Sequence, residues 1–163
     1  ANQWTALRYF AEANRFSRTV SAFAAYNATT RGTASQTVKA LESRGYLTRI
    51  RFDRDARSAR IDLTAAGWSQ LAADPALALT EALARLPAAL RGQLDRAVER
   101  LTCWVAAARA QNAFGTCEAC RHLQLRADAG TRTGGYYCRM LAAYLDSDDM
   151  RGLCALYAPA AAR

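Results

Sequence analysis

Four cysteines near the end of the chain have a spacing that suits a metal site. They follow the pattern Cys-x2-Cys-x17-Cys-x15-Cys and are Cys117, Cys120, Cys138 and Cys154. A gap of two residues allows two thiolates to converge on one metal ion, together with nearby backbone N–H groups. The second pair lacks this gap, so the pattern differs from a ribbon with two such turns. The sequence therefore predicts one metal centre held by four Cys.

Three kinds of chemistry fit this set of thiols. Zinc would hold the segment together without redox chemistry, whereas an iron–sulfur cluster would make it a sensor of oxygen, iron or redox state. Disulfides or unligated thiols are the third alternative, ranked last because disulfides are rare in the cytoplasm, where we expect this chain. A segment of this size buries little apolar surface, which favours a metal. Zinc is slightly favoured over an iron–sulfur cluster.

Two other reactive side chains are given structural roles. Cys103 lies between Leu101 and Val105 in a helical pattern, which predicts a buried, unreactive thiol. His122, the one histidine of the chain, follows Cys120 by two residues and could replace a cysteine as ligand. We favour a solvated or hydrogen-bonded histidine instead. With one histidine, sites built from several histidines are excluded.

Positive charge is concentrated in the first part of the chain. The chain carries 22 Lys and Arg residues against 14 Asp and Glu residues, a formal net charge of +8. Residues 1–64 hold 11 of the bases and 5 of the acids, a net charge of +6. Such an excess indicates a polyanionic partner, although it says nothing about the fold. No run of 18 uncharged apolar residues occurs, so no membrane partner is expected.

The basic part has the element order of a winged helix-turn-helix. Apolar residues at spacings of 3 and 4 predict three helices, over residues 2–14, 20–26 and 33–44. Thr33 is the predicted N-cap of the third helix, and Gly45 its end. Alternating segments then predict two strands, over residues 46–50 and 59–63, joined by a charged loop.

This arrangement suits double-stranded DNA. The outer face of the third helix would place small polar side chains in the major groove, and these are Thr33, Ser35, Gln36, Thr37 and Lys39. The hairpin carries four arginines suited to phosphates or to a narrow minor groove, and these are Arg49, Arg51, Arg54 and Arg57. The alternative for these arginines is a solvated charged loop.

The hairpin resembles the wing of the MarR family of bacterial transcriptional regulators. In that family an Asp-x-Arg wing is followed by a strand that ends in Leu-Thr, and then by small residues and a glycine that opens the next helix. Here the run Asp53-Arg54-Asp55-Ala56-Arg57 precedes Leu63-Thr64 and Gly67. The segment from Thr33 to Leu47 is similar to the recognition helix of the family, and the resemblance covers about residues 2–110.

The resemblance implies a homodimer on a pseudo-palindromic operator. Some similar regulators carry a Cys-bearing C-terminal extension that resembles this one. The family also has an N-terminal helix, which helps to build the dimer and precedes the segment that matches Gln3-Trp4. That helix is absent here, so we expect either a trimmed chain or a dimer that is built differently, and the opening Ala1 in place of Met favours a trimmed or processed chain. No signal peptide is expected.

A stripe of apolar residues follows the hairpin. It runs through two predicted helices, 75–86 and 88–110, at steps of 3 or 4, and consists of Leu79, Leu83, Leu86, Leu90, Leu94, Val98, Leu101 and Val105. One interpretation is a core helix packed on its own winged domain. The other, which we favour from the resemblance, is a dimer stem.

These patterns together predict three parts and a fold that is mainly α with a small β-hairpin wing. The head, residues 1–73, is a winged helix-turn-helix DNA-binding domain. The stem, residues 74–112, is a helical dimerisation segment, and the tail, residues 113–163, is a small Cys-rich metal-binding extension. The predicted function is a homodimeric DNA-binding transcriptional regulator, tuned through its tail by a redox signal or a small-molecule effector.

The alternative function is a metal-stapled winged-helix module that binds proteins and reads no DNA sequence. An enzyme is not expected. The chain shows no nucleophile–base pair, no phosphate-cradling glycine loop and no pair of carboxylates suited to acid–base chemistry.

Overall fold

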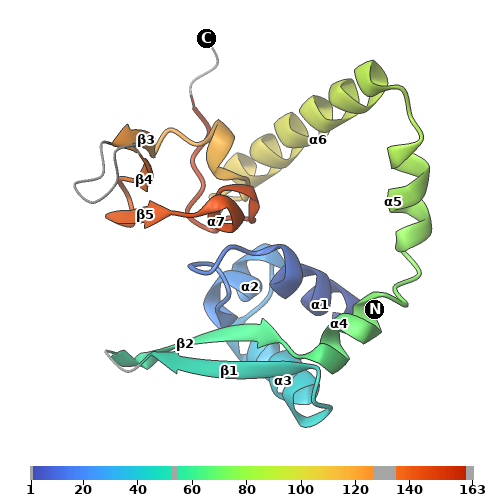
Figure 1. Cartoon of the computed structure of the whole chain (residues 1–163), viewed down its shortest axis with the longest axis vertical. Coiled ribbons are helices and arrows are strands. Elements are labelled where there is room, and N and C mark those ends of the chain that lie inside the picture. Colours follow the sequence, from blue (N-terminus) through green and yellow to red (C-terminus); the bar gives the residue numbers. More distant parts are fainter. Residues whose placement is uncertain (1, 53–54, 127–134, 161–163) are drawn as a thin grey trace.

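The computed structural model of the chain describes residues 2–52, 55–126 and 135–160. Figure 1 shows a head of helices with a β-hairpin, a stem of two helices that leaves the head beside α4, and a tail that lies against the head. None of the described helices is long and apolar enough to cross a lipid bilayer.

The head follows the predicted order of elements. These elements are α1 (Asn2–Glu12), α2 (Val20–Tyr26), α3 (Arg31–Ser43), β1 (Leu47–Phe52), β2 (Asp55–Leu63) and α4 (Ala65–Leu71). Helices α1, α2 and α3 enclose one core together with β2. The largest buried side chains of this core include Leu7, Tyr9, Phe10, Phe23, Val38, Leu41 and Ile61. Burying rings of this size supplies most of the stability of a small domain.

Threonines begin three of the head helices. Thr19 caps α2, because its Oγ1 accepts a hydrogen bond from the N–H of Ala22 at 3.1 Å. The predicted cap of α3 is wrong. That helix begins at Arg31, two residues early, because the extended Thr30 accepts from the N–H of Thr33 at 3.1 Å. Gly45, with φ of +72°, follows the end of α3 as predicted.

The two strands of the hairpin are longer than predicted. They pair antiparallel from Leu47 opposite Leu63 to Arg51 opposite Ala59, with an irregularity after Arg51. Most of the predicted loop, residues 51–58, therefore belongs to the strands. The wing projects from the head beside α3 (Figure 1).

A buried carboxylate marks the junction between head and stem. Asp74 forms an ion pair with Arg8 of α1, in which Nη2 of Arg8 lies 2.7 Å from Oδ1 of Asp74. This hydrogen bond lowers the pKa of Asp74. The same oxygen accepts from the N–H of Ala76 at 2.8 Å, so the first residues of the stem are tied to α1.

The stem does not pack on its own head. Neither α5 (Leu77–Ala84) nor α6 (Ala88–Ala108) contains a buried residue. Most of the apolar stripe is exposed instead, with 64% of Leu79 and 55% of Leu101 accessible to solvent, whereas Leu83 and Leu86 are half-buried. The interpretation as a core helix of the head is therefore wrong for this single chain.

The tail is a small sheet with a short helix. It comprises η1 (Cys117–Ala119), β3 (Leu123–Arg126), β4 (Gly135–Cys138), β5 (Ala143–Leu145) and α7 (Ser147–Arg151). The strands are antiparallel in the order β3-β4-β5. Asp146 caps α7 in a reciprocal box with Asp149.

Gly67 allows α4 to lie against the turn that precedes β1. A Cβ atom at Gly67 would lie 2.1 Å from the carbonyl oxygen of Tyr46, a backbone atom that cannot move aside cheaply. The substitution Gly67→Ala should therefore lower the free energy of unfolding by about 1–3 kcal/mol, measured by urea denaturation.

The control is Gly92→Ala in α6, where the nearest atom to the new Cβ is the flexible Arg96 Nη1 at 3.4 Å. This variant should be neutral or more stable by up to about 1 kcal/mol, because alanine favours a helix over glycine. Equal losses in the two variants would contradict this account of Gly67.

Candidate nucleic-acid interface and cysteine cluster

Helix α3 has one buried face and one face directed away from the head. Its buried residues are Ala34, Val38 and Leu41. Gln36 and Lys39 lie on the exposed side, and both are solvent-exposed. The amide of Gln36 and the amine of Lys39 can therefore extend away from the helix. Side chains of these types reach base edges and phosphates, respectively.

The remaining predicted residues of α3 are held more closely. Ser35 and Thr37 are half-buried. The hydroxyl of Thr37 donates to the carbonyl oxygen of Thr33 at 3.2 Å, and the hydroxyl of Thr33 lies 2.9 Å from that of Thr30. Thr33 and Thr37 thus bond to the helix itself.

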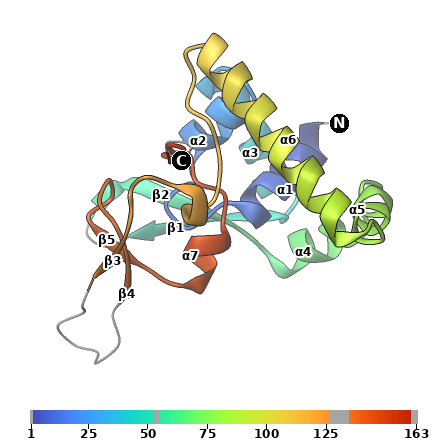
Figure 2. The ribbon, with the colours of Figure 1, turned by 90° about the horizontal axis from the view of Figure 1, so that it is seen from above.

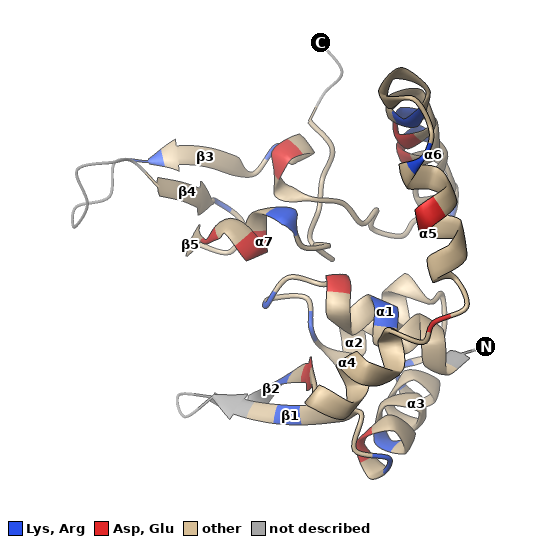
Figure 3. Ribbon diagram, turned by 45° about the vertical axis from the view of Figure 1, so that its right-hand side comes forward, with Lys and Arg blue, Asp and Glu red and all other residues tan. Residues whose placement is uncertain are grey.

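The hairpin is fixed to α3 by an ion pair. Nε of Arg49 on β1 lies 2.6 Å from Oε1 of Glu42 on α3. Arg49, predicted to contact DNA, therefore also sets the position of the wing relative to the helix. Figure 3 shows basic positions on both α3 and β1. Of the other predicted arginines, Arg54 and the side chains of Arg51 and Arg57 lie outside the described part of the chain.

The four predicted cysteines come from separate elements of the tail. Cys117 begins the short turn η1 and Cys120 follows it, with the N–H of Cys120 donating to the carbonyl of Cys117 at 3.0 Å. Cys138 ends β4. Cys154 follows α7, where its N–H donates to the carbonyl of Gly115 at 2.8 Å.

These thiols lie in one neighbourhood. Cys117, Cys138 and Cys154 are buried, Cys120 is half-buried, and none is in a disulfide. Burial raises the pKa of Cys117 to about 12, and the adjacent thiols of Cys154, Cys120 and Cys138 act in the same direction. A thiolate at this position is therefore unfavourable unless a cation compensates its charge.

The structure does not arrange the thiols as ligands. Among the residues that it describes, no group of three or more His, Cys, Asp or Glu side chains is placed to hold a metal ion. Gathering of the thiols is thus observed, whereas the metal centre stays a prediction. Cys103 on α6 is half-buried rather than buried, because the stem is not covered.

The contact of the tail with the head is not predicted by the sequence. The N–H of Leu153 donates to the carbonyl of Glu12 at 2.7 Å, and the N–H of Asn14 donates to the carbonyl of Leu153 at 3.0 Å. Figure 2 shows α7 of the tail close to α1. No local pattern announces such a pairing, because its partners are more than a hundred residues apart in the sequence.

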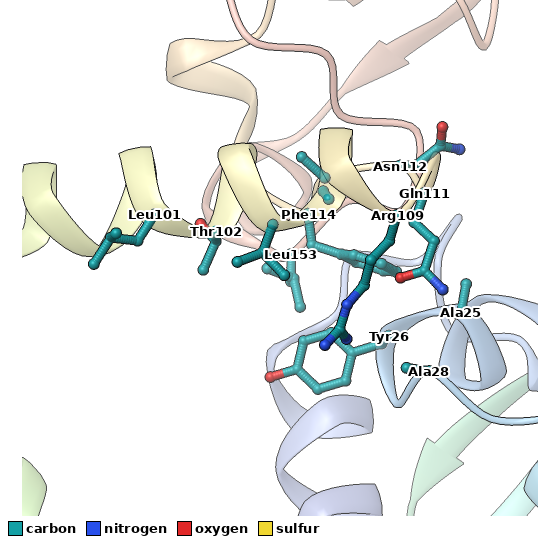
Figure 4. A pocket seen from close by; sticks show the side chains of 13 residues that line it. Ala25, Tyr26, Ala28, Leu101, Thr102, Arg109, Gln111, Asn112, Phe114 and Leu153 are labelled. Atoms are coloured by element: carbon teal, nitrogen blue, oxygen red, sulfur yellow. The ribbon is translucent and has the colours of Figure 1, made fainter.

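A cavity of about 460 Å³ lies where head, stem and tail meet. Its apolar wall includes Tyr26 of α2, Leu101 and Val105 of α6, and Phe114, whose ring centroid lies 5.2 Å from that of Tyr26. Figure 4 shows the side chain of Arg109 extending toward Tyr26 at the edge of this cavity. The cavity is thus mostly apolar, and its polar lining comprises Arg109, Thr102, Gln111 and Asn112.

Comparison with solved structures supports the fold over about two thirds of the chain. A MarR/EmrR family transcriptional regulator from Acinetobacter sp. ADP1 is 23% identical, with a TM-score of 0.51 over 65% of this chain and 75% of that chain. Weaker likenesses include FabT of Streptococcus pneumoniae in complex with DNA, at 16% identity and a TM-score of 0.49 over 65% of this chain and 75% of that chain. Another is a MepR–DNA complex of S. aureus, at 19% identity and a TM-score of 0.47 over 64% of this chain and 78% of that chain.

No curated protein sequence matches the chain. The sequence profile of one family, described as the MarR family, matches residues 1–58. This match includes the capped helix α3 and reaches into the second strand of the hairpin, which residues 59–63 complete. Over residues 1–58 the head is therefore similar to the MarR family, and its order of elements is that of a winged helix-turn-helix.

Proposed function

We propose that the protein is a transcriptional regulator that binds a pseudo-palindromic operator as a homodimer and carries a metal centre in its tail. The observation that carries the proposal is the uncovered outer face of α3, with Gln36 and Lys39 exposed on a MarR-family head. A helix presented in this way fits the major groove. The ion pair of Arg49 with Glu42 would keep the wing in place on the same duplex.

The dimer is supported by the stem. Its exposed apolar residues recur on one side of α6, and these are Leu90, Leu94, Val98, Leu101 and Val105. A contiguous apolar face of this kind marks an interaction surface. A second copy of the stem would cover it around a two-fold axis, and would bring two heads to two half-sites.

The metal centre is supported by the burial of thiols in a tail with a small core. That core consists of Cys117, Cys138, Leu145 and Met150, so thiols take the place of larger apolar side chains. The short turn from Cys117 to Cys120 suits zinc, which is favoured over an iron–sulfur cluster. A cation would stabilise the thiolates that burial disfavours, and would release protons as it binds.

A small-molecule effector is a further part of the proposal. The cavity between α2 and α6 would suit an apolar ligand, with Arg109 available to an anionic group. The competing function, a protein-interaction module, predicts no dependence of binding on DNA sequence and a flat dependence on salt.

DNA binding is tested on α3 with two neighbouring variants. Gln36→Ala should cost about 1–3 kcal/mol on duplexes with the preferred bases and little on others, because an amide reads base edges. Lys39→Ala should weaken binding to every duplex and reduce the salt slope by about 1, as expected of a phosphate contact. Gel shifts over a salt titration measure both, and a uniform loss in both variants would exclude α3 from the major groove.

The dimer is tested with a charge in the apolar stripe. Leu101→Glu should convert the dimer to a monomer in light scattering coupled to size-exclusion chromatography, since a carboxylate buried in an apolar interface is strongly unfavourable. Leu101 is exposed in the single chain, so its replacement should not unfold the protein. Arg96→Glu, at an exposed position on the opposite side of α6, is the control and should remain dimeric. A dimeric Leu101→Glu protein would refute this interface.

The metal centre is tested by metal content and visible absorption after purification without oxygen. The wild type should contain one equivalent of zinc and be colourless, whereas brown protein absorbing between about 320 and 420 nm would indicate iron–sulfur. Cys117→Ser and Cys138→Ser should lose the metal, and Cys103→Ser, the stem control, should keep it. Stoichiometric metal in a tail variant would remove that residue from the site.

A further inference from the structure

The loop between α1 and α2, residues 13–18, is held by the tail along its backbone. The N–H of Asn14 donates to the carbonyl of Leu153, as described above, and the N–H of Ala155 donates to Oγ of Ser17 at 2.9 Å. The two backbones touch at Gly152, where a Cβ would lie 2.8 Å from Cα of Asn14. This loop of the head thus has the tail as a direct neighbour.

Arg15 extends from the loop into the tail. Its guanidinium donates to the carbonyl of Tyr144 at 2.9 Å and pairs with the carboxylates of Asp149 at 3.1 Å and Asp146 at 3.2 Å. The side chain of Asp149 is 3% exposed, so this partner is shielded from solvent. The next residue, Phe16, packs on the core that contains Cys117 and Cys138. Two successive head residues therefore contact the tail around its buried cysteines, the part of the chain that we call the cysteine module.

The far end of the same loop holds the wing. The carbonyl of Arg18 accepts from the N–H of Ile61 on β2 at 2.8 Å, and its Nη1 pairs with Asp62 of β2 at 3.0 Å. Nε of Arg18 donates to the carbonyl of Ala13 at 2.8 Å, which closes the loop on itself. Ile61 is fully buried in the head core, so a shift of Arg18 would act on the base of the wing.

We infer that the cysteine module controls the position of the wing directly through loop 13–18, with Arg15 as the positioning residue. The inference rests on the proposed metal centre and DNA binding. With metal bound, the tail is ordered and holds Arg15, and the wing is held ready for DNA. When the metal leaves, the small core of the tail loosens and Arg15 loses its partners. The binding of DNA must then supply the free energy that orders loop 13–18.

A second route from tail to DNA is available through the stem. The hydroxyl of Tyr157 donates to Oε1 of Glu99 on α6 at 3.0 Å. Tyr157→Phe removes this bond and keeps the ring. Arg151→Ala removes an exposed ion pair within the tail, that with Asp148 at 3.1 Å. These two variants separate the loop route from the stem route and from a general disturbance of the tail.

The first experiment follows amide hydrogen exchange and needs no DNA. Arg15→Ala should speed exchange at the amide of Ile61 and in residues 14–18, and should leave Val38 and Leu41 in α3 protected. Stripping the wild type with a chelator should produce the same pattern. Unchanged exchange at Ile61 in Arg15→Ala would overturn the inference. A wild type that holds no metal would instead refute the proposed metal centre, and this control of the wing with it.

The second experiment measures affinity for a duplex selected from a random pool by the metal-loaded wild type. Removal of metal should weaken binding by the wild type at least about fivefold. Arg15→Ala should keep its metal and bind the duplex as weakly as the stripped wild type. The ratio of the affinities of its metal-loaded and stripped forms should therefore be near 1. Tyr157→Phe and Arg151→Ala should keep the wild-type ratio.

Two outcomes would overturn the inference while leaving the proposed regulator intact. One is that metal-loaded and stripped Arg15→Ala differ in duplex affinity by the same ratio as the two forms of the wild type. The other is loss of the ratio in Tyr157→Phe alone, which would assign the coupling to the stem. Failure to select any duplex would refute the proposed DNA binding itself.

Discussion

Burial of apolar side chains is concentrated in one part of this chain. The rings of Tyr9, Phe10 and Phe23 fill the core of the head, whereas α5 and α6 bury no residue and the tail core relies on thiols. The burial of these rings therefore supplies the main apolar core of the head. The stem and the tail depend on something further, which we propose to be a second copy and a metal ion.

The winged helix could be predicted because its signals are local. Helical periodicity, the glycine after α3 and the alternation of the hairpin each lie within a dozen residues. The cap of α3 was missed since Thr30 and Thr33 stand one helical turn apart, and only the extended backbone of Thr30 decides between them. The pairing of Arg49 with Glu42 depends on how the hairpin folds back, which charge patterning does not encode.

The tail illustrates the opposite limit. The spacing of the cysteines predicts a shared site that stays a prediction, and the structure shows three of these thiols buried and one half-buried. The docking of Leu153 on Glu12 and Asn14 joins the two ends of the chain, and no periodicity reports it. Burial of Cys103 was wrongly predicted for a related reason. An apolar stripe shows that a helix has a face to cover, but not whether its own chain covers it.

The ion pair between Arg8 and Asp74 ties the start of the stem to α1 of the head. In the proposed dimer this joint occurs twice, so a small rotation at it would become a larger change in the separation of the two α3 helices. Half-sites on DNA recur at intervals of about 34–36 Å, which leaves little tolerance. Because the bond to Arg8 lowers the pKa of Asp74, the carboxylate stays ionised into the acid range. One buried group that touches no DNA would thus set the operator spacing that the protein can span.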